Sequence, residues 1–210
     1  MNKSTHFDPD VLRVGHLLAD AARAATLPFF RRADLVADNK LAGGYDPVTI
    51  ADREAERVMR EILARERPRD AVLGEEYGAL SGTSGLTWVL DPIDGTRGFV
   101  SGTPTWGVLI ALGDAEGPFF GIIDQPYIGE RFVGTPSGAE LTGPAGKTAL
   151  VTRAARDLSQ ATVMTTFPEV GTRDEATAFA EVSRQARLTR YGMDCYAYGL
   201  VAAGQIDLVI

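Results

Sequence analysis

Cysteine and histidine are almost absent from this chain. Cys195 is the single cysteine, which excludes an internal disulfide framework and a Cys-based zinc site. The two histidines, His6 and His16, both precede the first motif, so a Ser-His-Asp triad or a His-rich zinc site is not expected. We expect His16 to have only a structural role. If the protein is an enzyme, we expect carboxylates and a metal ion to do its chemistry.

Long apolar runs and an excess of positive charge are also missing. No stretch of about 18 apolar residues could span a membrane, and the N-terminal segment MNKSTHFDPD lacks the apolar core of a signal peptide. The net charge of −7 disfavours nucleic-acid binding, which requires a basic face. We therefore expect a cytoplasmic protein with neither nucleic acid nor membrane as a partner. Such an acidic protein can still bind a phosphate if it first captures a divalent metal.

The first half of the chain predicts two helices followed by a sheet. The 210 residues, 45% of them hydrophobic, allow one sizeable core or two small packed halves. Asp8 and Pro9 begin a helix that runs to residue 30, and a second helix runs from Thr49 to just before Pro68. Short strands separated by glycine and proline then predict an antiparallel, hairpin-linked sheet. The expected strands are 71–74, 87–91, 105–113, 119–124 and 130–134.

The second helix has an amphipathic pattern. Its apolar residues have helical spacing and predict a buried stripe. The stripe comprises Ile50, Ala55, Val58, Met59 and Ile62. We expect the opposite, polar face to carry Asp52, Glu54 and Glu56.

The pattern changes in the second half to alternating strands and helices, which predicts an α/β unit. The expected order is strand 161–166, helix 172–186, strand 187–191, helix 194–204 and the apolar segment 206–210. We place the boundary between residues 1–145 and 146–210. The Gly-Lys-Thr at this boundary is interpreted as a turn, because Leu141 occupies the position where a P-loop needs glycine.

Three acidic clusters precede the boundary. They are Asp52 on the second helix, the Glu75-Glu76 pair after a strand, and Asp91 with Asp94 in the segment WVLDPIDGTRGF. Hard divalent cations such as Mg²⁺ prefer oxygen ligands, so carboxylates at strand ends predict a metal site. An EF-hand is excluded because the twelfth position counted from Asp91 is Gly102 rather than Glu.

The Asp94-Gly95 step has two interpretations. A strand-to-helix turn after Asp94, with Pro92 fixing the turn, would aim the free N–H groups of Gly95 and Thr96 at an anion. Alternatively, Asp94-Gly95 is only a turn or a helix cap, and Glu75-Glu76 is only a solvated loop.

Taken together, the segments DPVTIADREAE, LGEEYG and WVLDPIDGTRGFVSGTPTWGVLIAL resemble the inositol monophosphatase superfamily in order and spacing. Within it, the chain looks most like the histidinol-phosphatase branch. The segments that carry this second resemblance are DGTRGF, SGTPTWG, GIIDQPYIGERFVG and RYGMDCYAYGLVAAGQIDLVI. The resemblance implies an α+β and α/β layered sandwich, in which helix and sheet layers alternate.

The resemblance also implies roles for individual residues. It implies that two or more Mg²⁺ ions are held by Glu75, Asp91, Asp94 and the carbonyl of Ile93. Thr96 would orient the attacking water together with Glu75, and Asp52 would lie in the outer metal sphere. The implied substrate-binding residues are Gly95, Thr96, Arg97, Gly192 and Asp194. Lys40 precedes the Asp52 motif, as a lysine does in the family.

The predicted contacts to the alcohol part of the substrate depend on the segment YGMD, which aligns with family residues that touch this part. Asp194 could pair with a substrate amine or serve as the N-cap of the helix that follows it, and both roles can hold together. The family carries a further metal-ligating aspartate beyond the point where this chain stops, and Asp207 does not match it. We therefore expect an incomplete C-terminal part and an incomplete second metal site.

The implied function is Mg²⁺-dependent hydrolysis of a small phosphate monoester, with L-histidinol phosphate as the first candidate. Inositol phosphate or another small polyol phosphate is the alternative substrate. A catalytically silent metal-binding or phosphate-binding fragment is a third possibility, favoured by the missing aspartate. The resemblance also implies a homodimer.

Overall fold

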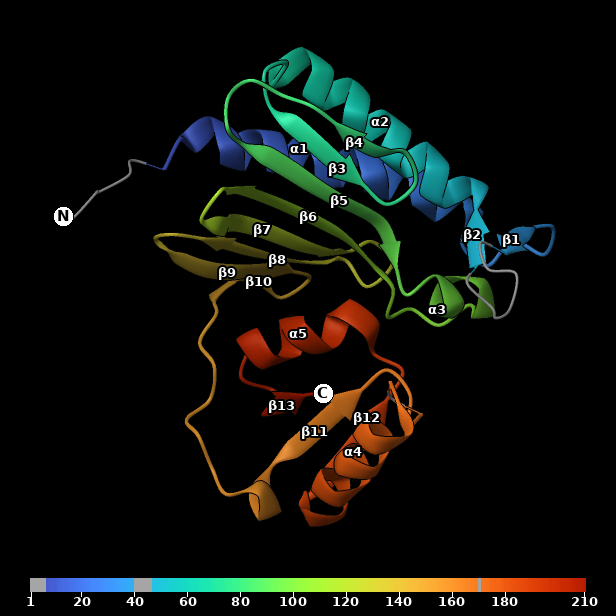
Figure 1. Cartoon of the computed structure of the whole chain (residues 1–210), viewed down its shortest axis with the longest axis vertical. Helices are drawn as coiled ribbons and strands as arrows, with labels where there is room; N and C mark the ends of the chain where they lie inside the picture. Colours follow the sequence, from blue (N-terminus) through green and yellow to red (C-terminus); the bar gives the residue numbers. More distant parts are fainter. Residues whose placement is uncertain (1–6, 40–46, 170) are drawn as a thin grey trace.

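The computed structural model describes residues 7–39, 47–169 and 171–210, and its helices and sheets alternate in layers (Figure 1). Helices α1 (Pro9–Thr26) and α2 (Ile50–Glu66) cover one face of a large sheet. Helix α5 (Asp194–Ala202) lies between that sheet and a smaller one. The layered α+β and α/β sandwich is therefore the observed architecture.

The large sheet has eight strands and is mostly antiparallel. Each pair of neighbours is antiparallel except β3 and β5, which run parallel. In spatial order the strands are β10 (Gly146–Ala149), β9 (Gly138–Gly143), β8 (Glu130–Thr135), β7 (Gly117–Gln125), β6 (Gly107–Asp114), β5 (Thr87–Asp94), β3 (Ala71–Gly74) and β4 (Gly78–Leu80).

The smaller sheet is parallel, with β11 (Thr162–Thr165) between β12 (Leu188–Tyr191) and β13 (Leu208–Val209). The chain moves from β11 through α4 (Arg173–Gln185) to β12, and then returns through α5 to the other side of β11. Because parallel crossovers are right-handed, these opposite directions place α4 and α5 on opposite faces. The face that carries α5 is thereby turned toward the large sheet.

The remaining elements are short. They are the 3₁₀ helices η1 (Leu27–Phe29) and η2 (Leu158–Gln160), helix α3 (Thr96–Ser101), and the hairpin of β1 (Ala37–Asn39) with β2 (Pro47–Thr49). The first predicted helix accordingly ends at Thr26 and continues only as the 3₁₀ turn η1. Its predicted start is confirmed, because Asp8 caps the helix and Pro9 is its first residue. No helix in the described part of the chain is both long and apolar enough to cross a bilayer.

The main core lies between α1, α2 and the large sheet. Its largest side chain, Trp88, is fully buried and contacts Phe120 edge to face. Burying each large apolar side chain contributes about 1.5–3 kcal/mol. A second cluster, Phe30, Ala51, Ile93, Phe99 and Trp106, packs under the turn that follows β5.

The predicted stripe of α2 is confirmed at Ala55 and Met59, which are fully buried, but the prediction was wrong for Ile50, Asp52 and Glu56. Ile50 is 58% exposed, whereas Asp52 and Glu56 are buried at 1% and 0% exposure. The buried face follows the i, i+4 spacing from Asp52 through Glu56 and includes Met59 and Leu63. Both carboxylates can be buried because each accepts hydrogen bonds, as described below.

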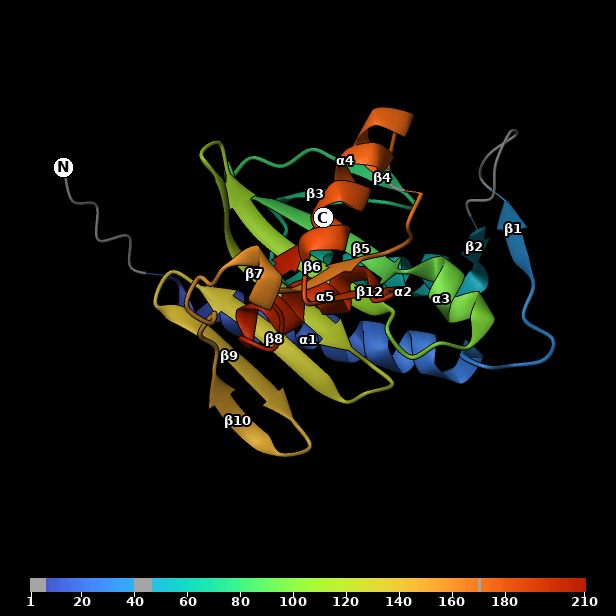
Figure 2. The ribbon, with the colours of Figure 1, turned by 90° about the horizontal axis from the view of Figure 1, so that it is seen from below.

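The Gly-Lys-Thr at the predicted boundary lies in a β-hairpin. Strand β10 begins at Gly146 and pairs with β9 through the register Gly146 with Gly143. Gly-Lys-Thr is therefore the start of a strand that directly follows the turn at 144–145, which corrects the prediction of a turn and excludes a P-loop. The division at 145/146 cuts this hairpin, and the large sheet continues to Ala149. Figure 2 shows the β9–β10 hairpin reaching away from the other strands.

Candidate active site

Strand β5 carries the two aspartates, and a β-bulge determines where they point. Asp91 pairs with Leu109 of β6 and Asp94 pairs with Gly107, so β5 has one residue more than its partner across this interval. On a regular strand, residues three apart face opposite sides of the sheet. The extra residue changes the side of the sheet to which the following side chains point, so both carboxylates line the same groove. Pro92 is therefore part of a bulged strand and not of a turn after the strand, as the sequence had indicated.

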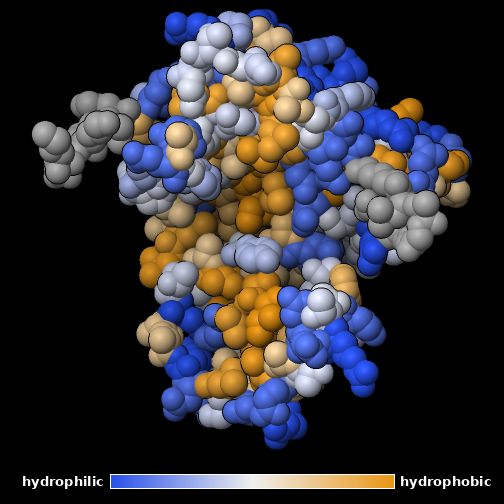
Figure 3. Space-filling model, in the orientation of Figure 1, coloured by the Kyte–Doolittle hydropathy of each residue, from blue (hydrophilic) through white to orange (hydrophobic). Residues whose placement is uncertain are grey.

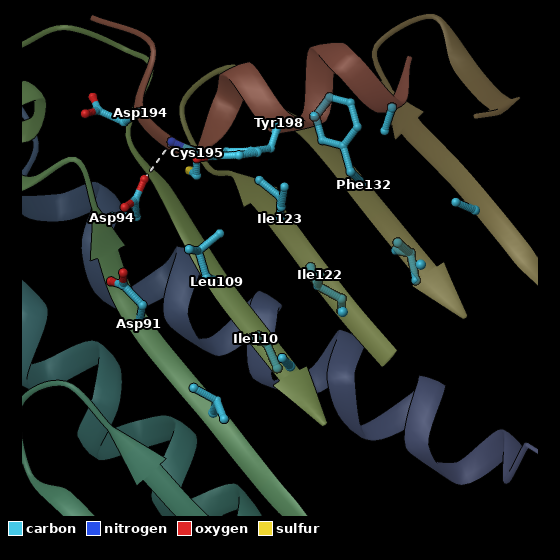
Figure 4. Close-up of a pocket in the computed structure, with 18 of the residues that line it drawn as sticks. Asp91, Asp94, Leu109, Ile110, Ile122, Ile123, Phe132, Asp194, Cys195 and Tyr198 are labelled. Atoms are coloured by element: carbon cyan, nitrogen blue, oxygen red, sulfur yellow. Dashed lines mark hydrogen bonds between the residues drawn. The ribbon is translucent and has the colours of Figure 1, made fainter. Parts of the chain in front are cut away.

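The groove has a volume of about 810 Å³ and lies between the large sheet and α5. Figure 4 shows Asp91, Asp94 and Asp194 at one end of it, while Leu109, Ile123, Phe132 and Tyr198 line the remainder. Figure 3 shows the same contrast on the surface, where apolar side chains fill the waist between the two sheets. The acidic end is therefore the part of the groove suited to a charged ligand.

Among the three aspartates at the acidic end of the groove, Asp91 has the environment least favourable to a negative charge. Its Oδ1 atom is buried and has no hydrogen-bond partner. Burial, together with the charges of Glu75 and Asp94, raises the pKa of Asp91 to about 8. A buried polar atom without a partner costs about 1–3 kcal/mol, and a cation at this point would remove that cost.

Glu75 reaches the same location from a neighbouring strand. It directly follows β3, which runs parallel to β5, and its backbone N–H donates to Leu90 O at 3.2 Å. Parallel neighbours end at the same edge of a sheet, so Glu75 is placed beside Asp91. The two carboxyl groups lie within hydrogen-bonding reach.

The turn after β5 joins the strand to α3 and to α2. Gly95 has φ of 84°, a left-handed conformation that glycine adopts without strain, and it is the N-cap of the predicted helix. The Thr96 hydroxyl donates to Ile93 O at 3.0 Å, and its oxygen lies 3.4 Å from Asp52 Oδ1. Thr96 thus connects the carbonyl predicted to ligate the metal with a buried carboxylate of α2.

Asp52 is fixed by a capping box at the start of α2. Its Oδ2 accepts from the backbone N–H of Thr49 at 2.8 Å and from the Thr49 hydroxyl at 2.6 Å. Burial raises the pKa of Asp52 to about 6 despite these hydrogen bonds. Asp52 can therefore hold or release a proton near neutral pH.

Helix α5 approaches the aspartates with its N-terminus. The backbone N–H of Cys195 donates to Asp94 Oδ2 at 2.6 Å (Figure 4). Asp194 is not the N-cap, because Met193 holds that position and no side-chain cap bond is formed. Burial and the charge of Asp94 raise the pKa of Asp194 to about 6.

Asp194 is also strained and close to the turn. Its φ of 42° is unusual for a residue other than glycine. A Cβ added at Gly95 would lie 2.7 Å from Asp194 Oδ2, so the turn and the start of α5 are in close contact. Gly192 accepts from the Thr105 hydroxyl at 3.0 Å through its carbonyl. The Arg97 guanidinium lies over the Phe167 ring, 5.8 Å from its centroid.

Some predicted residues lie elsewhere or outside the described chain. Lys40 and His6 fall outside the described residues. His16 lies on α1, with its Nδ1 atom 3.0 Å from Arg131, on the side of the sheet away from the groove. Asp207 accepts from the backbone N–H of Thr162 at 2.8 Å and pairs with Arg153, and it is not among the residues that line the groove.

The donor set fits Mg²⁺, although within the described residues no three His, Cys, Asp or Glu side chains form a complete metal-binding group. Mg²⁺ usually keeps several waters and is held by one or two carboxylates together with substrate phosphate oxygens. Hard oxygen donors, two of them on one bulged strand, and an unpartnered buried Asp91 oxygen meet that requirement.

Comparison with known proteins identifies the family of the chain. A family profile described as the inositol monophosphatase family matches residues 10–210. The chain belongs to the inositol monophosphatase family. A histidinol-phosphatase of Streptomyces coelicolor is 39% identical over 209 residues, covering 95% of this chain and 76% of that protein. The likeness therefore includes the histidinol-phosphatase branch of the family.

Two further family members resemble the chain closely. The chloroplastic bifunctional phosphatase IMPL2 of Arabidopsis thaliana is 40% identical over 200 residues, which are 94% of this chain and 56% of that protein. A solved structure of an inositol monophosphatase from Zymomonas mobilis has a TM-score of 0.81 and 40% identity, and covers 96% of this chain and 76% of that chain. The chain thus spans between about half and three quarters of these relatives.

Sequence reasoning missed Glu56 as a residue near the site. It was placed on the polar face of α2, yet it is fully buried and contacts the turn that carries Glu75. Its i, i+4 spacing from Asp52 was the available signal, because residues at this spacing share a helix face.

Proposed function

We propose that this protein is a Mg²⁺-dependent phosphatase that hydrolyses L-histidinol phosphate to L-histidinol and inorganic phosphate. The observation that carries the proposal is the bulge in β5, which turns Asp91 and Asp94 toward one groove and leaves a buried Asp91 oxygen without a partner. Membership of a family that contains histidinol-phosphatases supports it.

The metal would be held by the carboxylates of Glu75, Asp91 and Asp94 and by the Ile93 carbonyl. When bound, Mg²⁺ lowers the pKa of a water, neutralises phosphoryl oxygens and stabilises the leaving alkoxide. The α5 N–H that bonds Asp94 Oδ2 holds this carboxylate in place. The other Asp94 oxygen would be the one that binds the ion.

The attacking water would be oriented by Thr96. Since the Thr96 hydroxyl donates to Ile93 O and lies 3.4 Å from Asp52 Oδ1, its oxygen can accept a hydrogen bond from that water. Glu75 would accept the second water proton. Asp52, whose pKa is about 6, can hold a proton at the Thr96 side of the site.

The substrate would lie across the turn and the start of α5. The N–H groups of Gly95 and Thr96 would donate to the phosphate, and Arg97 would add positive charge at the groove edge. Asp194 and Gly192 would face the alcohol part, where an Asp194 carboxylate complements the ammonium group of histidinol. Such an ion pair also lowers the pKa of Asp194 and favours its charged form.

Inositol phosphate is the second candidate. The 40% identity to an inositol monophosphatase structure favours it, and Asp194 could accept hydrogen bonds from polyol hydroxyls instead of pairing with an amine. A catalytically silent metal-binding or phosphate-binding protein is the remaining alternative.

A phosphate-release assay separates the three. The purified chain is incubated with L-histidinol phosphate, inositol 1-phosphate and glycerol 2-phosphate, each with Mg²⁺ and with EDTA. We expect Mg²⁺-dependent release that is fastest from histidinol phosphate. Faster release from inositol phosphate would favour the second candidate. Absence of release from all three monoesters would favour the catalytically silent protein.

A further inference from the structure

Glu56 is a buried carboxylate that binds the backbone next to a predicted metal ligand. It lies on α2 with 0% exposure. Its Oε2 atom accepts from the N–H of Glu76 at 2.6 Å, and its Oε1 atom accepts from the N–H of Tyr77 at 3.2 Å. These two residues directly follow Glu75, so one side chain of α2 holds the two peptide groups after the ligand.

The backbone before this point is held as well. The N–H of Glu75 donates to Leu90 O in the neighbouring strand β5. Glu75 is therefore the residue between two anchors, one on the strand that carries Asp91 and one on the helix that carries Asp52. We propose that Glu56 is a positioning residue, which sets the distance of Glu75 from Asp91; this inference rests on the proposed function.

The surroundings of Glu56 are built for this contact. Arg60, one helical turn later, donates to Glu56 Oε1 at 2.7 Å from its Nε atom and to the carbonyl of Gly78 from Nη2. It therefore neutralises the buried charge and binds the far end of the same turn. A carboxylate is buried without large cost only when it is paired and hydrogen-bonded in this way.

Gly74 leaves the space that the Glu56 carboxylate occupies. A Cβ added at Gly74 would overlap the carboxylate carbon and both oxygens of Glu56. An alanine at 74 would therefore displace the Glu56 carboxylate without altering Glu56 itself. This gives two independent ways to break the same contact.

The first test compares Glu56→Gln with wild type. Glutamine fills the same space, but it offers one acceptor oxygen where two N–H groups and Arg60 need acceptors. The matched control is Glu54→Gln, on the same helix, whose carboxylate pairs with Arg57 at the surface. Mg²⁺ affinity is measured by titration calorimetry in the presence of inorganic phosphate, with thermal unfolding recorded alongside.

We expect Glu56→Gln to weaken Mg²⁺ binding by about 10–100-fold, the usual cost of losing a group that orients a ligand, while the control stays within twofold of wild type. In metal-free protein, we also expect faster hydrogen exchange at the amides of Glu76 and Tyr77 than in wild type. A folded Glu56→Gln protein with unchanged Mg²⁺ affinity overturns the positioning role, even if its thermal midpoint falls.

The second test uses Gly74→Ala, which decides the question if Glu56→Gln does not fold. Its control is Gly134→Ala in strand β8, where the nearest heavy atom to an added Cβ is 4.0 Å away. We expect Gly74→Ala to reproduce the loss of Mg²⁺ affinity, and wild-type affinity in this variant overturns the proposal. If wild type itself binds no Mg²⁺, the proposed function fails together with this inference. If wild type binds Mg²⁺ and neither Glu56→Gln nor Gly74→Ala weakens the binding, the proposed function stands and only the role of Glu56 is overturned.

Discussion

Replacing Asp91 with asparagine should change how the stability of the metal-free protein depends on pH. In the folded chain, burial and the charges of Glu75 and Asp94 raise the pKa of Asp91 from 3.8 to about 8. In the unfolded chain, Asp91 loses its proton near the ordinary value. Between these two pH values the folded state binds one more proton than the unfolded state, so stability falls as the pH rises.

The magnitude follows from the shift. Each pH unit between the two pKa values costs about 1.36 kcal/mol, so raising the pH from 5 to 8 removes up to about 4 kcal/mol of unfolding free energy through Asp91. A chain of this size shifts its thermal midpoint by about 2–4 °C per kcal/mol. Asparagine does not titrate, and its own cost of about 1–3 kcal/mol for a poorly paired amide does not vary with pH.

The assay is urea unfolding of wild type and Asp91→Asn in EDTA at pH 5, 6, 7 and 8. The difference in unfolding free energy between the two proteins cancels the titrating groups that do not interact with Asp91, and leaves the contribution of Asp91 together with the carboxylates Glu75 and Asp94 whose charges act on it. We expect the unfolding free energy of the variant, taken relative to that of wild type, to increase by up to about 4 kcal/mol from pH 5 to pH 8. Two parallel pH profiles would refute the reasoning, because they would mean that Asp91 is solvated and not buried among carboxylates.

Three further substitutions test the rest of the site. Asp194→Ala should weaken the specificity constant for histidinol phosphate more than that for inositol phosphate, by about 1–3 kcal/mol if a charge pair is lost, as measured by steady-state kinetics on both substrates. Gly95→Ala should lower the unfolding free energy by about 1–2 kcal/mol and slow catalysis, because φ is 84° and the new Cβ meets Asp194; urea unfolding and phosphate release measure the two effects. Thr96→Val should lower kcat with little change in KM, since it removes the hydroxyl and keeps the shape.

Each of these has a result that contradicts it. Equal losses on both substrates would remove Asp194 from amine recognition. Wild-type stability and rate in Gly95→Ala would show that the turn relaxes without disturbing Asp194. A rise in KM alone in Thr96→Val would place the hydroxyl in substrate binding and not in the orientation of water.

The elements that the sequence predicted well are those with strong local signals. The capped start of α1 and the helix at Thr49 were correct because Asp8, Pro9 and Thr49 act on neighbouring backbone groups. The strand-to-helix turn at Gly95 was correct for the same reason. The motif spacing also gave the family, which the profile match confirms.

The features that were missed depend on residues distant in sequence. Apart from its i, i+4 spacing from Asp52, nothing in the sequence around Glu56 shows that the turn after β3 folds over it, so a carboxylate on a helix was interpreted as solvated. Asp194 was considered as a helix cap because it precedes a helical segment. In the structure it has φ of 42°, lies against the Gly95 turn and makes no capping bond. The bulge at Pro92 is likewise visible only in the register with β6.

The most direct test of the central claim is the rate of phosphate release from L-histidinol phosphate by wild type and by Asp91→Asn at saturating Mg²⁺. Asp114→Asn, an exposed residue at the end of β6, is the matched control. We predict that Asp91→Asn releases phosphate no faster than wild type does in EDTA, that it stays folded, and that the control keeps the wild-type rate. A wild-type rate in Asp91→Asn at saturating Mg²⁺ would contradict the assignment of this aspartate as a metal ligand.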